Sequence, residues 1–246
     1  MLCSIAMQLD LQGRINPYLK GGELMPVLNS NILSSEGQPW FSIEISPTHE
    51  AGARSFMDHL EECIERGEKL TDGNTIDMWS GRLKLIANKN GSLVVHEPSF
   101  SEFPIKWVPG ANRTFSHLML QKILCAEIGV EPDFSSLIQI GLISKVMLQR
   151  FGDFQMDRYV GDGQANSGWT FYEMGKVDAS DVTWASLFQI CVAYPQVVPF
   201  FGLPSESHII YRHDLIEVSC AGRIIDSNSN AFLRSLLLSK NYGLSA

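Results

Sequence analysis

Residues 166–181 contain the densest group of side chains in the sequence that could carry chemistry. Ser167 precedes a glycine and two aromatic positions, and Asp178, Ser180 and Asp181 follow in a polar loop. A serine can act as a nucleophile and a carboxylate as a general base, provided that a partner group lies within hydrogen-bond reach. One hypothesis is therefore a small enzyme that combines Asp178 and Asp181 with a histidine, either His208 or His213.

The same residues also have a structural interpretation. Ser167-Gly168 is typical of a tight turn, and Asp153 and Asp157 lie in a stretch rich in glycine and aspartate. Ser180 or Asp181 directly precedes a periodic segment, 182–193, which we expect to be a helix with one of them as its N-cap. The sequence has no GxSxG, phosphate-loop or HExxH motif. We therefore expect no enzyme, no cofactor and no metal site.

Composition limits the classes of protein. The chain has 246 residues, 45% hydrophobic content and a net charge of −8, which favours a folded protein that binds neither nucleic acid nor anionic membranes. The N-terminus does not read as a signal peptide and no apolar run is long enough to span a bilayer, so a cytoplasmic protein is expected. Free, buried thiols are expected for the scattered cysteines Cys3, Cys63, Cys125, Cys191 and Cys220.

Residue patterns predict an α+β fold. The first half should contain, in order, a strand at 41–46, a helix at 48–70 with Thr48 as N-cap, a hairpin of 82–87 with 92–97, and a helix at 114–128 ended by Gly129. The second half should contain a strand or short apolar element at 137–144, the helix at 182–193, a strand at 208–212 and a terminal helix at 231–238. Glu131-Pro132-Asp133 marks a boundary, giving two small domains, 1–135 and 136–246, each with an antiparallel sheet flanked by helices.

The predicted helix at 48–70 is amphipathic. Its apolar stripe should face a core, and the opposite side carries an acidic stripe of Asp58, Glu61, Glu65 and Glu68. Such a stripe is usually a solvated helix face, and the alternative is a docking surface for a basic partner.

The second half also resembles a known family. The runs Gly141-Leu142-Ile143-Ser144, Asp157-Arg158-Tyr159, Asn166-Ser167-Gly168-Trp169-Thr170-Phe171 and Ala193-Tyr194-Pro195 are similar to those of bacterial polymorphic-toxin immunity proteins, family thirty-three. The resemblance covers residues 138–218, and the acidic stretch after the aromatic residues is sparser than the family pattern.

The resemblance implies a non-enzymatic protein that neutralises a cognate toxin, such as the effector of a type VI secretion effector–immunity pair. The expected toxin is a nuclease, because an acidic protein complements the basic site that holds phosphates. Candidate partner-binding residues are the acidic stripe together with Trp169, Phe171, Glu173, Asp178 and Asp181. Trp169 has a second interpretation as a core residue. An adaptor of a secretion apparatus is the remaining alternative.

Overall fold

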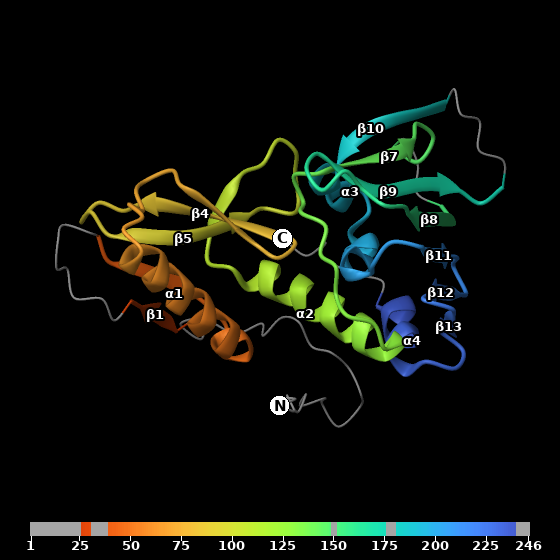
Figure 1. Cartoon of the computed structure of the whole chain (residues 1–246), viewed down its shortest axis with the longest axis horizontal. Helices are drawn as coiled ribbons and strands as arrows, with labels where there is room; N and C mark the ends of the chain where they lie inside the picture. The colour runs from red at the N-terminus through yellow and green to blue at the C-terminus, as the bar shows by residue number, and fades with distance from the viewer. Residues whose placement is uncertain (1–25, 31–38, 149–151, 176–180, 240–246) are drawn as a thin grey trace.

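The computed structural model describes residues 26–30, 39–148, 152–175 and 181–239, which form an α+β fold with two mixed sheets (Figure 1). The first part of the chain forms, in order, β1 (Val27–Asn29), β2 (Phe41–Glu44), η1 (Pro47–His49), α1 (Glu50–Glu65), β3 (Thr75–Met78), β4 (Gly81–Ala87), β5 (Leu93–Pro98), β6 (Trp107–Pro109) and α2 (Asn112–Ile128). The second part forms β7 (Ile140–Ser144), β8 (Phe154–Arg158), β9 (Asn166–Glu173), β10 (Val182–Ser186), α3 (Leu187–Ala193), η3 (Pro195–Gly202), β11 (Ser207–Tyr211), β12 (Ile216–Cys220), β13 (Arg223–Asp226) and α4 (Ala231–Leu238). The predicted fold class is confirmed.

The first sheet has the strand order β1-β2-β5-β4-β3, with β6 paired to β5. The predicted hairpin is confirmed as the antiparallel pair of β4 and β5. The prediction of an antiparallel sheet is wrong for one pair, because β2 and β5 run parallel. All other pairs of this sheet are antiparallel, as predicted. α1 buries its apolar stripe against the sheet with Phe56, Met57 and Leu60.

The start of α1 differs from the prediction. Thr48 is not its N-cap, because a short helix, η1, precedes α1 and ends at His49. The Oγ of Ser46 instead accepts a hydrogen bond from the Thr48 amide and caps η1. The helical periodicity was sufficient to find the helix, but it does not separate an α-turn from a 3-10 turn at its end.

α2 connects the two sheets. Figure 1 shows it running from beneath the first sheet to α4 at the far side of the molecule. Phe115 near its beginning belongs to the core under the first sheet, whereas Leu124 and Cys125 in its last turns belong to the core of the second. The helix ends at Gly129, whose φ of 74° is the left-handed conformation predicted for this cap.

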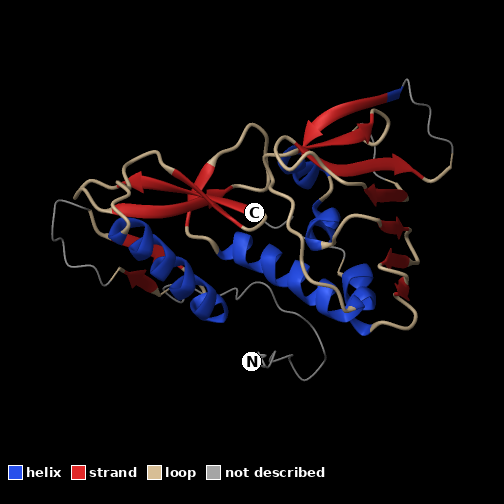
Figure 2. Cartoon of the chain, in the orientation of Figure 1, coloured by secondary structure: helices blue, strands red, loops and turns tan. Residues whose placement is uncertain are grey.

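The second sheet has the order β10-β7-β9-β8-β11-β12-β13. Its strands pair antiparallel except for β7 and β9, which are parallel. The helices α2, α3 and α4 and the 3-10 helix η3 lie on one side of it (Figure 2), where they enclose the larger core.

The predicted helix at 182–193 is wrong in its first half. Residues 182–186 form β10, paired with β7, and only Leu187–Ala193 is helical. Val, Thr and Trp are strand-favouring residues, and this preference prevails once β7 offers a partner edge. The helix therefore has Ser186 as its N-cap, with its Oγ accepting from the Gln189 amide at 3.1 Å. Asp181 is not a helix cap, and Ser180 lies outside the described residues.

The expected tight turn at Ser167-Gly168 is a bulge inside β9. Between the paired residues Ile140 and Leu142, β7 has one residue, whereas β9 has the three residues between Asn166 and Thr170. Gly168 has a φ of 80°, and a β-carbon there would lie 2.0 Å from the carbonyl oxygen of Tyr159. Only glycine fits this close approach of two backbones.

Asp157 is likewise not a turn residue, because it lies in the middle of β8. The described cysteines, Cys63, Cys125, Cys191 and Cys220, are free and buried as predicted, and Cys3 lies outside the described residues. Within the described ranges, no helix combines the length and the apolar character needed to cross a membrane.

Candidate functional site

The described elements cover only one side of the second sheet. Helices cover the side that faces the core, and we call the opposite side the outer face (Figure 2). Strand register places one row of directly opposed side chains across it: Trp184, Leu142, Thr170, Asp157, His208, Ser219 and Ile224. These side chains are half-buried in the middle of the row and exposed at its ends, at 55% for Trp184 and 66% for Ile224. The described part of the chain therefore leaves this face uncovered.

A hydrogen-bonded group of three side chains lies at the centre of the outer face. Asp157 Oδ1 lies 2.5 Å from His208 Nδ1, and Asp157 Oδ2 accepts a hydrogen bond from the hydroxyl of Tyr172. The three residues come from the neighbouring strands β8, β11 and β9. Burial raises the pKa of Tyr172, and the hydrogen bond to Asp157 and the charge of Asp157 raise it further. The tyrosine therefore stays a neutral donor, which holds the carboxylate in place.

The outer face is acidic. Its described strands carry the outward carboxylates Asp157, Glu217 and Asp226. No lysine or arginine of these strands points outward, because Arg158 and Arg223 share the core side with their neighbours on the paired strands. The arrangement complements a positively charged surface.

This group could orient a histidine for proton transfer, and Ser219 lies next to His208 on β12. Among the hydrogen bonds of the described residues, however, none joins Ser219 to His208. A hydrolytic site would also need hydrogen-bond donors directed at a developing oxyanion. Backbone amides in a sheet point along its plane towards neighbouring strands, so they are not directed at a group bound on the face. The described hydrogen bonds thus orient the imidazole of His208 but connect it to no nucleophile.

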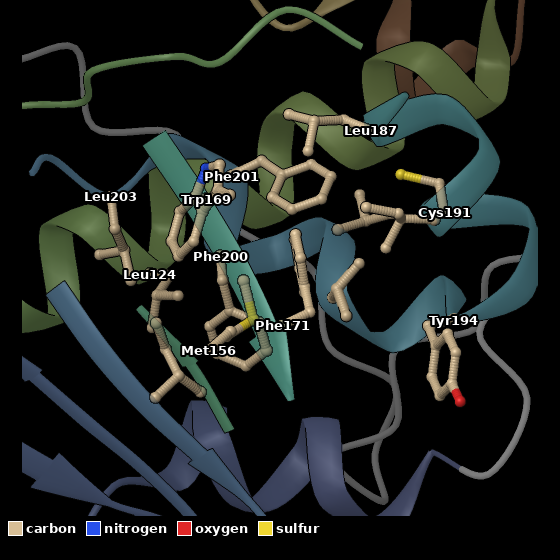
Figure 3. Close-up of a cluster of buried hydrophobic side chains, with 14 of the residues drawn as sticks. Leu124, Met156, Trp169, Phe171, Leu187, Cys191, Tyr194, Phe200, Phe201 and Leu203 are labelled. Carbon is tan, nitrogen blue, oxygen red and sulfur yellow. The ribbon is translucent and has the colours of Figure 1, made fainter. Parts of the chain in front are cut away.

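Trp169 and Phe171 lie in the core. Their relative exposures are 0% and 1%, and both pack against Phe201 (Figure 3). The indole nitrogen of Trp169 donates to Ser135 Oγ at 3.0 Å. The structure therefore contradicts their predicted role as partner-binding residues. The alternation along β9 turns them inward, and it turns Tyr172 outward.

Of the predicted acidic residues near β9, Glu173 and Asp181 lie on either side of the end of β7, where they contact Ser144 and Lys145. Glu173 is half-buried and accepts a hydrogen bond from Ser144 Oγ at 3.0 Å. Asp181 directly precedes β10, and its Oδ1 lies 4.0 Å from Lys145 Nζ. Asp178 lies outside the described residues. From β10 to β11, the strand of His208, there are four strand spacings of about 4.8 Å, or roughly 19 Å in all. Asp181 and His208 do not share a site.

The acidic stripe lies on the solvent side of the first sheet's helix. Asp58 and Glu65 are exposed on α1, and Glu61 is half-buried. Glu68 lies beyond the end of the helix and pairs with Arg66 at 3.0 Å. The stripe is part of the surface, but Arg54 lies within it and pairs with Glu50.

The group of Asp157, Tyr172 and His208 was not predicted from the sequence. The alternation of apolar and polar residues in Phe154-Gln155-Met156-Asp157 is a sequence signal that Asp157 lies in a strand. No sequence pattern indicates that β8 lies between β9 and β11, because strand neighbours in a mixed sheet are set by packing over long separations.

No protein-family model matches the chain, and no curated protein or solved structure matches it at a significant level. The resemblance to an immunity family thus stays a prediction.

Proposed function

We propose that the protein is a binding protein that neutralises a basic partner protein, as an immunity protein does with a toxin, and that it does so through the outer face. The observation that carries this proposal is the open, acidic face with Tyr172, Asp157 and His208 at its centre. Aromatic and hydrogen-bonded side chains held in place before binding lose little conformational entropy in the complex.

A nuclease is the toxin class that this charge favours. Nuclease sites are basic because they hold phosphates, so a surface with outward carboxylates can occupy such a site and associate rapidly with it. The sequence resemblance independently supports an immunity function. An adaptor in a secretion apparatus would use the same face and would differ only in its partner.

The first experiment tests the activity. The chain should protect cells that express the toxin encoded beside its gene, and it should co-purify with that toxin. If the chain protects against none of the toxins encoded nearby, the immunity function is rejected. If it binds a secretion component instead, the adaptor alternative is correct.

The second experiment locates the surface with two matched double variants. Gln155→Lys with Glu217→Lys adds positive charge at two outer-face positions, on either side of Ile210. Asp58→Asn with Glu65→Lys changes the charge on α1 by the same amount. We expect the first pair to weaken toxin binding about tenfold or more, or by about 1.4 kcal/mol, and the second to leave it unchanged. The opposite result would assign binding to the acidic stripe.

A further inference from the structure

We propose that β10 pairs with the β10 of a second copy of the chain, antiparallel and about a two-fold axis at Trp184, to form a homodimer. Figure 1 shows β10 at the upper edge of the second sheet, with no described element beyond it. This inference is independent of the proposed toxin-binding function.

Among the described residues, the backbone of β10 presents hydrogen-bonding groups without a partner beyond the sheet edge. The Lys145 amide donates to Asp181 O at 2.9 Å, and the Leu187 amide donates to Gln139 O at 2.8 Å. In an antiparallel pair such bonded positions alternate, so Val182, Trp184 and Ser186 direct their amides away from β7. Within the described part of the chain, no group beyond the sheet edge accepts a hydrogen bond from these amides.

β10 lacks the features that normally prevent edge pairing. Its sequence, VTWAS, has no charge and no proline, and its central side chain, Trp184, is 55% exposed. Natural proteins protect edge strands with charges, prolines, bulges or short length. The other edge of this sheet, β13, begins with Arg223 and ends with Asp226. β3 contains the Asp77 that pairs with Arg82, and β1 spans only three residues.

A second copy fits this edge because β10 is complementary to itself. With the two-fold axis at Trp184, this residue exchanges both backbone bonds with its counterpart, and each Val182 carbonyl accepts from the Ser186 amide of the other copy. The two indoles then lie on the same face as a directly opposed aromatic pair, which stabilises antiparallel pairing. No like charges meet, since the strand has none.

The test uses charge at the axis. In the proposed dimer, Trp184 of one chain lies opposite Trp184 of the other. Trp184→Lys alone or Trp184→Glu alone therefore places like charges opposite each other. Each variant should weaken dimerisation at least about tenfold, whereas an equimolar mixture should restore a dimer that contains one copy of each. The control is Ile224→Lys at the opposite edge of the same row, which should keep the wild-type dimer.

Mass is measured by sedimentation equilibrium over a range of concentrations, with circular dichroism to verify folding. The proposal would be overturned if the wild-type chain had the mass of a monomer at every concentration. That result is expected if the edge of β10 binds an extended segment of another protein instead. A dimer that survives both single variants, or a mixture that stays monomeric, would also overturn it. Independently, hydrogen exchange at the Trp184 amide should slow as concentration rises, while exchange at Thr183, which bonds within the sheet, should not.

Discussion

At Gly168 the backbone of β9 passes so close to Tyr159 that a side chain cannot be accommodated. Gly163 provides a natural comparison, because its φ of 72° is similar but a β-carbon at this position would have nothing within 4 Å of it. The two glycines therefore separate the energetic cost of a left-handed conformation from the cost of a steric clash.

Gly163→Ala should lower the free energy of unfolding by about 1 kcal/mol, the cost of placing an L-residue at positive φ. Gly168→Ala should lower it by about 3 kcal/mol or more, because the backbone of Tyr159 must also move. Urea denaturation measures both values. Equal losses would mean that the bulge relaxes without cost.

Asp157 should control the ionisation of Tyr172. Burial, the hydrogen bond and the charge of Asp157 together raise the pKa of Tyr172, so the neutral phenol is favoured in the folded state. This contribution to stability is present below the ordinary pKa of 10.0 and is lost as the pH rises through the folded value.

Asp157→Asn removes the charge and leaves the burial, so the pKa of Tyr172 should fall part of the way to its ordinary value. Tyrosinate absorbance in an alkaline titration measures this, with Tyr172→Phe identifying the signal. An unchanged titration in Asp157→Asn would show that burial alone determines the pKa.

Individual residues of the site could be predicted only in part. The sequence indicated that Trp169 could belong to the core, and it is fully buried there. It could not indicate that Asp157 and His208 meet, because they lie on strands separated by 51 positions in the chain. Contacts of this kind depend on strand order, which local patterns do not encode.

Among the elements, α2 begins with an unusual cap. Its N-cap residue, Ala111, has no side-chain acceptor, and the buried carboxylate of Glu97 at the end of β5 takes that role. Glu97 accepts from the amides of Arg113 at 3.1 Å and Thr114 at 2.7 Å. Glu97 thus satisfies N-terminal amides that have no partner within α2, and it attaches the helix to the first sheet.

Burial raises the pKa of Glu97 above its ordinary 4.5, although the amides of Thr114 and Arg113 act in the opposite direction. The folded state then binds more protons than the unfolded state between the ordinary and the raised pKa of Glu97, so its stability falls as the pH rises through that window.

Glu97→Gln should remove this pH dependence of the free energy of unfolding, measured by urea denaturation across the pH range. Glu65→Gln on exposed α1 should retain the pH dependence. Glu97→Ala should cost about 2 kcal/mol through the lost hydrogen bonds.

Elements with strong local signals were predicted well. The Asn-Gly turn located the β4–β5 hairpin, and Gly129 located the end of α2. Residues 182–193 were assigned to one helix because their apolar spacing fits a helix as well as a strand followed by a helix. Short segments of this kind are decided by their tertiary partner, here β7.

For the whole molecule, Gln121 is the central link between the two halves. It is buried in α2, where its Oε1 accepts from Ser80 Oγ at 2.7 Å and its Nε2 donates to Val198 O at 3.0 Å. Ser80 precedes β4 of the first sheet, and Val198 lies in η3 beside the second. The predicted boundary between residues 135 and 136 lies after α2, which packs on both sheets, and the independence of the two domains stays a prediction.

Gln121→Leu should remove the hydrogen bonds to Ser80 and Val198 and lower the free energy of unfolding by about 2–4 kcal/mol. Because α2 belongs to both cores, the loss should appear in one transition, with tryptophan fluorescence and circular dichroism changing together. Gln155→Leu on the half-exposed outer face should change stability by less than about 0.5 kcal/mol. Two separate transitions would contradict the coupling.

The shared helix also has a consequence for synthesis on the ribosome. α2 is complete at Ile128, but η3, which covers its last turns, ends only at Gly202. At about 5–20 residues per second, the intervening segment takes roughly 4–15 s to translate. During that interval Leu124 and Cys125 have no core to enter, so the nascent chain exposes an apolar helix face that a chaperone can bind. The helix that contributes to both cores of the folded protein therefore exposes apolar side chains while the chain is being synthesised.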